Sequence, residues 1–218
     1  MSNSIVAQVP KNLLFRYRIG CREVKGKFGA RFQLDESYRV PHFGSFEKQN
    51  EFADVRVGWN TEGLYFDVTI SGKKQSLWCR QSELLESDGV QFWIDTRDTH
   101  NIHRATKFCH WFVCLPVGGG PQNTSPVATM LKINRSQEDS PTINRNSMEL
   151  HAKTTPDGYR LIAFISGKSL HGWNSEDHRH LGFNYAVQDR EFGWQTLAVG
   201  PELPIREDPS LWQTLSLR

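Results

Sequence analysis

The sequence predicts an all-β protein, a sandwich of two antiparallel sheets of the jelly-roll or immunoglobulin-like kind with long loops. Short segments of alternating apolar and polar residues recur along the chain, which is the periodicity of half-buried strands. Long polar or glycine-rich stretches separate several of these segments. The length of 218 residues suits one all-β domain. We therefore expect a single domain over residues 1–218, with seven tryptophans available for its core.

The first half of the chain contains three of the expected strands. The first alternating segment lies within residues 12–20. Residues 26–50 mix glycine, proline, phenylalanine and charged residues without a period, which indicates an irregular edge segment. A hairpin follows, because residues 52–60 and 63–70 both alternate and the turn Thr61-Glu-Gly63 joins them.

The second half of the chain continues the pattern with longer connections. Further strands are expected at residues 87–95, 107–115, 148–153, 158–165 and 180–189. Polar or glycine-rich loops are expected at residues 96–106, 117–126 and 135–147, and one helical turn at residues 166–172. Loops of this length in a sandwich often carry binding residues.

Residues 87–97 form the most informative segment of the chain. Strand alternation places Val90, Phe92 and Ile94 on one face and Gln91, Trp93 and Asp95 on the other. A large aromatic residue therefore stands on the face that alternation would leave polar. Such a tryptophan is either a stacking platform for a ligand or part of a second core.

Taken in order, these segments resemble carbohydrate-binding module family nine, a module appended to some xylanases, within the wider DOMON-like superfamily. The resemblance runs from roughly residue 50 to the C-terminus and leaves residues 1–49 as a first strand and an irregular edge segment. Its most specific pieces are Asp88-Gly-Val-Gln-Phe-Trp-Ile-Asp95, Asp157-Gly-Tyr159, Leu181-Gly-Phe-Asn-Tyr185 and Asp208-Pro-Ser-Leu-Trp212. The resemblance implies non-catalytic binding of a sugar or glycan, in the context of carbohydrate catabolism.

A sugar site pairs flat aromatic rings with a few fixed hydrogen-bonding groups. The resemblance places one clamp tryptophan at Trp78 and a second near residues 205–206, where this chain has no aromatic residue. Gln91 replaces a family glutamate, and Phe112 and Cys114 replace an arginine and an asparagine. By strand parity we expect one shared and rather apolar face, lined by Gln91, Trp93, His110, Phe112 and Cys114. The sequence thus predicts a carbohydrate ligand that stacks on Trp78 and this face and is hydrogen-bonded by Gln91.

A cofactor-binding function is one alternative. DOMON-like domains also bind haem through a methionine with a histidine or lysine. The pairs available here are Met130 with His110 and Met148 with His151. The second pair is three residues apart on one strand, so its side chains point to opposite faces.

A protein-interaction domain that has lost sugar binding is the other alternative. An exposed apolar patch around Trp93 and Phe112 would favour it. Catalysis is not expected, because the sequence has no nucleophile elbow, phosphate loop, dinucleotide fingerprint or zinc-protease motif.

The resemblance also implies structural calcium, which takes carboxylate and carbonyl oxygens from loops. Asp95, Asp98 and the region of Asp54 or Glu62 place acids near loop ends, and none matches a particular family ligand. A transition-metal site is not expected, because the histidines and cysteines of residues 100–114 lack zinc-ligand spacing.

Composition limits the partners and the compartment. A net charge of +2 gives no argument for nucleic acid or for an anionic membrane. No stretch approaches the ~20 apolar residues of a transmembrane helix, and the first residues lack a signal-peptide pattern. The four cysteines are expected to be reduced. We therefore expect a cytoplasmic protein whose partner is a carbohydrate or another protein.

Overall fold

The computed structural model describes residues 11–47, 49–142 and 147–218. The strands are β1 (Arg18–Glu23), β2 (Ala53–Asn60), β3 (Gly63–Ile70), β4 (Gly89–Asp95), β5 (Cys109–Gly119), β6 (Ser125–Leu131), β7 (Met148–Thr155), β8 (Gly158–Ser166), β9 (His180–Asp189), β10 (Gly193–Thr196) and β11 (Gln213–Leu217). The helices of the described ranges are short 3₁₀ turns, namely η1 (Lys11–Leu14), η2 (Glu36–Tyr38), η3 (Phe43–Glu47), η4 (Gln81–Glu83), η6 (Gly167–Ser169) and η7 (Pro209–Leu211). None of them is long and apolar enough to cross a membrane. The predicted all-β class is confirmed.

The strands form one continuous mixed sheet, where two antiparallel sheets were predicted. Its order is β6-β5-β4-β9-β11-β1-β2-β3-β8-β7, and β10 pairs with β9 beside this path. Strand β1 runs parallel to both of its neighbours, β11 and β2. The purely antiparallel arrangement is therefore wrong. Alternation within a strand reports which side is buried, but it does not report the direction of the neighbouring strand.

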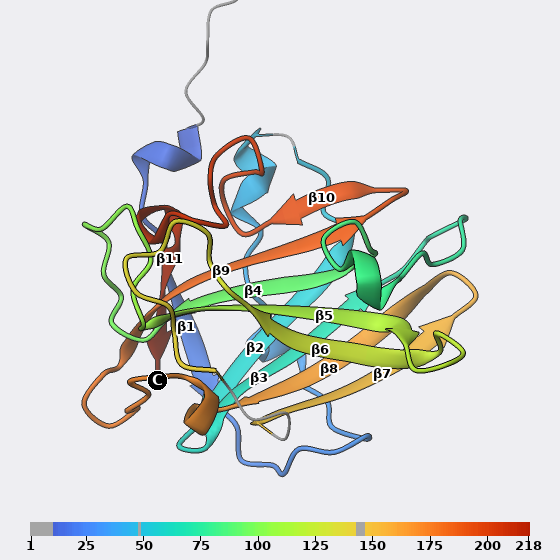
Figure 1. The fold of residues 1–218 in the computed structure, drawn as a ribbon, viewed down its shortest axis with the longest axis horizontal. Coiled ribbons are helices and arrows are strands. Elements are labelled where there is room, and N and C mark those ends of the chain that lie inside the picture. The colour runs from blue at the N-terminus through green and yellow to red at the C-terminus, as the bar shows by residue number, and fades with distance from the viewer. Residues whose placement is uncertain (1–10, 48, 143–146) are drawn as a thin grey trace, which may run out of the picture.

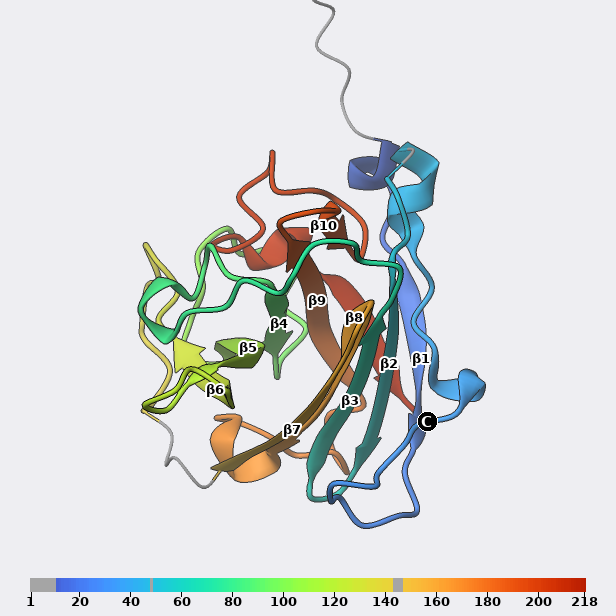
Figure 2. The same ribbon diagram turned by 90° about the vertical axis from the view of Figure 1, so that its right-hand side faces the viewer.

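The sheet curls so far that it nearly closes into a barrel. Strand β1 links its two halves, and the edge strands β6 and β7 come close to each other (Figure 1). Figure 2 shows the curl from the side, with β4, β5 and β6 facing β3, β7 and β8. The two halves thereby enclose a common interior.

The interior of the curled sheet is the main core. Val90, Phe92 and Ile94 of β4 point into it, as predicted. The ring of Phe92 stacks on Phe66 of β3, with centroids 4.0 Å apart, and both are fully buried. Burial of each such side chain contributes about 1.5–3 kcal/mol.

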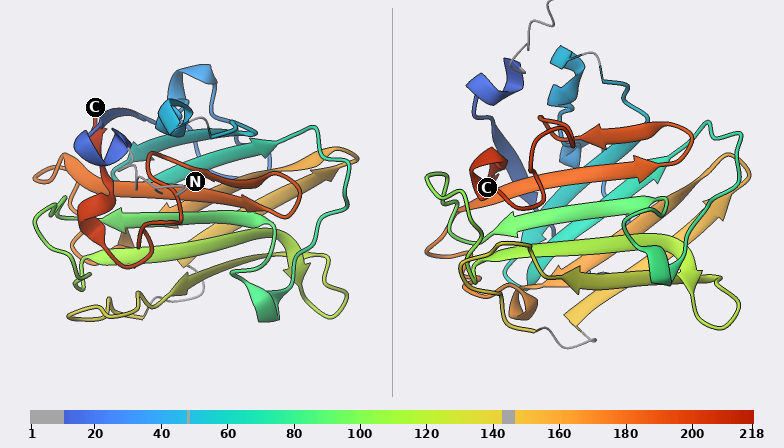
Figure 3. Two further views of the ribbon diagram at one scale, coloured as in Figure 1. Left: turned by 90° about the horizontal axis from the view of Figure 1, so that it is seen from above. Right: turned by 45° about the horizontal axis from the view of Figure 1, so that its top comes forward.

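The outer face of β4, β5 and β9 carries a second core. Its buried members are Cys79, Trp93, Ala105, Cys109, Trp111, Val113, Leu115, Val127, Ile133, Ala186 and Trp212. Several of these residues come from the loops before β4, before β5, after β6 and before β11, so the loops cover this face. Figure 1 looks onto it, and the right-hand view of Figure 3 shows β10, β9, β4 and β5 side by side. Of the two roles considered for Trp93, the second-core role is confirmed.

Candidate functional site

The outer face is organised around Trp93 in the middle of β4. Trp93 pairs with Trp111 of β5 on one side and with Asn184 of β9 on the other. Directly opposed residues project to the same face of a sheet, so these three side chains form a row. The two indole rings stack, with centroids 5.7 Å apart and planes inclined by 18°. Gln91 lies two residues along β4 from Trp93 and faces the same way.

His110, Phe112 and Cys114 do not share this face, so the predicted common face is wrong. The paired residues are Ile94 with His110, Phe92 with Phe112, and Val90 with Cys114. Phe112 and Cys114 accordingly lie in the main core. The parity within each strand was sound, but relating two strands requires their register, which alternation alone does not give. Trp93 and Phe112 are fully buried on opposite faces, so they form no exposed apolar patch.

The outer face contains four buried polar atoms without a hydrogen-bond partner among the described residues. They are Gln91 Oε1, Trp93 Nε1, Trp111 Nε1 and Asn184 Nδ2. The amide nitrogen of Gln91 donates to Gln188 Oε1 over a long 3.4 Å. A buried polar atom left unpaired costs about 1–3 kcal/mol. Four such atoms on three adjacent strands make this face a candidate for a polar ligand.

Arg206 lies above the centre of this face. Its guanidinium carbon is 5.0 Å from the ring centre of Trp194 and 5.8 Å from that of Trp111. Trp194 is half-buried and pairs with Gln188 of β9. Burial lowers the pKa of the half-buried Arg206, and the nearby Glu86 carboxylate opposes that shift. Arg206 and Trp194 also line a cavity of about 330 Å³ together with Pro201, Leu203, Pro204, Ile205 and Glu207.

Trp78 lies at the end of the face where β4 begins. The half-buried ring has two guanidinium groups over it, Arg190 at 4.4 Å and Arg80 at 5.5 Å. Its backbone is held by Asp88, because the Trp78 N–H donates to Asp88 Oδ2 at 3.1 Å and the Asp88 N–H donates to the Trp78 carbonyl at 2.9 Å. Trp78 was predicted from the sequence and Trp194 was found in the structure. Both rings are half-buried and therefore partly accessible to solvent.

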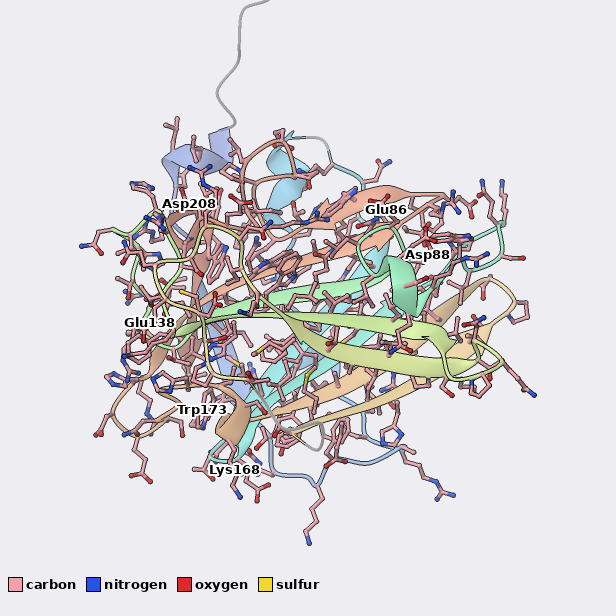
Figure 4. The ribbon with its side chains drawn as sticks, in the orientation of Figure 1. Glu86, Asp88, Glu138, Lys168, Trp173 and Asp208 are labelled. Carbon is pink, nitrogen blue, oxygen red and sulfur yellow. The ribbon has the colours of Figure 1, made fainter. Side chains whose placement is uncertain are left out.

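A buried ionic cluster fixes the loop that carries Trp78. Lys73 Nζ lies 2.5 Å from Asp189 Oδ2 and 3.4 Å from Asp88 Oδ2, and all three side chains are buried. Asp88 Oδ1 also accepts the N–H of Arg190 at 2.8 Å. The cluster therefore ties the loop before β4 to the turn after β9, which places Arg190 over Trp78. In Figure 4 Asp88 and Glu86 lie near each other at this end of the molecule.

His110 is buried, and both of its ring nitrogens have partners within the protein. Its Nε2 accepts the backbone N–H of His171 at 2.8 Å, and its Nδ1 lies 3.4 Å from the carbonyl of Ile94. Burial lowers the pKa of His110 to about 4, so the ring is neutral at pH 7. Because both ring nitrogens are engaged, His110 offers no free nitrogen for the considered haem pairing with Met130.

Asp95 and Asp54, two of the acids considered for calcium, have partners within the protein. Asp95 accepts the N–H groups of Arg97 and Thr99, and burial raises its pKa. Asp54 forms an ion pair with Arg56 at 2.5 Å. Among the described residues, no group of three or more His, Cys, Asp and Glu side chains is arranged to hold a metal. Structural calcium stays a prediction. The four cysteines are buried free thiols.

Trp111, Asn184, Trp194 and Arg206 were not predicted as site residues from the sequence. Asn184 could have been singled out from the sequence, because it is a polar residue in the apolar strand Leu181-Gly-Phe-Asn-Tyr185. Arg206 stands where the resemblance expected a second clamp tryptophan. Trp194 reaches the face through β10, a short strand that had no alternating signal long enough to predict it.

Comparison with known proteins identifies the fold. No family model matches the chain, and no curated protein matches it. Among solved structures, it is similar to a carbohydrate-binding module family 9 protein from Caldicellulosiruptor kristjanssonii. In the complex with cellotriose the TM-score is 0.63 at 14% identity, over 93% of this chain and 94% of that chain. In the complex with glucose the values are 0.63 and 14%, over 93% and 96%. The chain therefore has the fold of the family 9 carbohydrate-binding modules, as its sequence predicted.

Proposed function

We propose that this protein binds a carbohydrate, without catalysing a reaction, on the outer face of β10, β9, β4 and β5. The observation that carries the proposal is the combination of indole rings with four buried, unpaired polar atoms on one face. Sugars present apolar C–H faces and a polar rim, so they need flat rings together with fixed hydrogen-bonding groups.

The fold supports this proposal. Two solved structures with the same fold are family 9 carbohydrate-binding modules in complex with cellotriose and with glucose. The loops over the outer face also bring Trp78 and Arg206 against strands that carry polar side chains. A cavity of about 330 Å³ beside Trp194 falls within the usual size range of small-ligand sites.

The residues of the face divide into three roles. The half-buried rings of Trp78 and Trp194 stack on sugar C–H faces. Gln91 and Asn184 supply hydrogen-bonding groups from β4 and β9. The buried pair of Trp93 and Trp111 forms the floor beneath these groups.

A thermal-shift screen against mono- and oligosaccharides tests this function. A ligand at 100 times its Kd adds about 2.7 kcal/mol to the free energy of unfolding. For a chain of this size that corresponds to a rise in Tm of roughly 5–11 °C. We expect Trp78→Ala and Trp194→Ala to weaken or abolish the sugar-dependent rise.

Trp173→Ala is the matched control for these variants. Trp173 is also half-buried, and its Nε1 already donates to the Thr61 carbonyl at 3.1 Å. Figure 4 shows it at the opposite end of the molecule from Glu86 and Asp88. This variant should keep the full sugar-dependent rise. A rise that survives both site substitutions would overturn the assigned face.

A further inference from the structure

The unpaired atoms of the outer face are mostly hydrogen-bond donors. Three of the four are N–H groups, those of Trp93, Trp111 and Asn184, and they belong to one row across β5, β4 and β9. The fourth, Gln91 Oε1, is an acceptor. A buried donor requires an acceptor, and none of these three donors is paired with one among the described residues.

Arg206 adds a charged donor to the same place. A guanidinium group has five N–H donors and no acceptor, and it stays charged in proteins. Arg206 lies over the rings of both Trp194 and Trp111 and is half-buried. The ion pairs found in the described ranges of the chain do not include Arg206, Arg190 or Arg80.

The acidic side chains near these arginines either bind other groups or make no direct contact with Arg206. Asp88 and Asp189 enclose Lys73. Glu191 accepts the backbone N–H groups of the loop at residues 74–75. Glu86 is exposed and acts on Arg206 only through the electrostatic field, and Glu207 lines the cavity beside it. The guanidinium over the Trp93 row is therefore not neutralised by a direct contact.

We propose that the glycan bound on this face carries an anionic group, a carboxylate or a sulfate, which Arg206 receives at the cavity beside Trp194. This inference rests on the carbohydrate-binding function proposed above. A hydroxyl brings a donor together with its lone pairs, whereas a carboxylate or sulfate brings acceptors alone. A guanidinium without an ion pair matches the second kind of group, and arginine can hold such a group through two parallel hydrogen bonds. Arg190 and Arg80 beside Trp78 extend the cationic surface to a neighbouring sugar unit.

Titration calorimetry with matched glycan pairs tests the proposal. One pair is an oligogalacturonate and its neutral methyl ester, and the other is a sulfated galacto-oligosaccharide and its desulfated parent. The two pairs separate a carboxylate ligand from a sulfated one. We expect the acidic member of at least one pair to bind about tenfold or more tightly than its neutral partner, as one charge-assisted contact implies. The preference should shrink as salt is added.

Two variants locate the effect. Arg206→Gln should remove most of the preference for the acidic member. Arg179→Gln is the control, because Arg179 also lies over an indole ring, that of Trp59 at 5.0 Å, outside the proposed site. Loss of the preference for the acidic glycan in both variants, or in neither, would contradict the proposal that Arg206 binds the anionic group.

The outcomes separate the two proposals. Equal affinity for the acidic and neutral members of both pairs would overturn the anionic ligand and leave carbohydrate binding in place. Binding of none of the four glycans, by a protein with an intact melting transition, would overturn the anionic ligand, and the thermal-shift screen with mono- and oligosaccharides decides the carbohydrate-binding function separately.

Discussion

Substitution of Lys73 by methionine probes the cluster that positions Trp78. The Lys73 ammonium lies 2.5 Å from Asp189 and 3.4 Å from Asp88, and the side chains of all three are at most 2% exposed. Methionine keeps much of the volume of lysine but removes the charge, so two buried carboxylates lose their cation. Removing one partner of a buried ion pair costs about 3–5 kcal/mol. For a chain of this length the Tm should fall by roughly 6–20 °C.

Urea unfolding followed by tryptophan fluorescence measures this loss, with Lys74→Met as the control. Lys74 is the next residue and its side chain is exposed, so its substitution should change the free energy of unfolding by less than about 0.5 kcal/mol. A loss below about 1 kcal/mol, or equal losses in both variants, would refute the reasoning.

The remaining predictions concern His110 and Asn184. Burial lowers the pKa of His110 to about 4, so between pH 6.5 and 4 the unfolded chain binds this proton and the folded chain does not. The contribution of the neutral His110 ring to the free energy of unfolding is therefore fully present above about pH 6.5. It is lost as the pH falls, and the loss reaches roughly 3 kcal/mol at pH 4. His110→Gln should flatten the pH dependence of the urea midpoint over this range, and an unchanged slope would contradict the neutral buried ring. Asn184→Leu removes an unpaired buried amide, so it should leave the free energy of unfolding unchanged or raise it by about 1–3 kcal/mol. The same variant should weaken sugar binding by about tenfold, and a destabilised variant with unchanged affinity would show that Asn184 serves packing instead.

The sequence predicted the all-β class and the faces within single strands correctly. Alternation placed Phe92 inside and Trp93 outside, because successive side chains of a strand point in opposite directions and burial selects the apolar set. It failed between strands. The loop of residues 96–108 sets the register that pairs Trp93 with Trp111, and no local pattern reports that offset.

The parts of the candidate site outside regular strands were also beyond local pattern. Arg206 comes to the face through the loop between β10 and β11, whose course depends on tertiary contacts such as the hydrogen bond from Trp212 Nε1 to the Ile205 carbonyl at 2.8 Å. Parallel pairing of β1 is a further case, since it joins the strand of residues 18–23 to the C-terminal strand. The first feature depends on a contact within the loop region, and the second on pairing between strands far apart in sequence.

The most direct test of the proposed site follows the indole N–H resonances during a titration with a bound glycan. Seven tryptophans give resolvable probes, and single Trp→Phe substitutions assign them. We predict saturable shifts for Trp93 and Trp111, whose N–H groups are unpaired. The indole N–H groups of Trp59 and Trp173 already donate to backbone carbonyls away from this face, so their resonances should stay in place. Shifts confined to Trp59 and Trp173, with Trp93 and Trp111 unmoved, would contradict carbohydrate binding on the outer face.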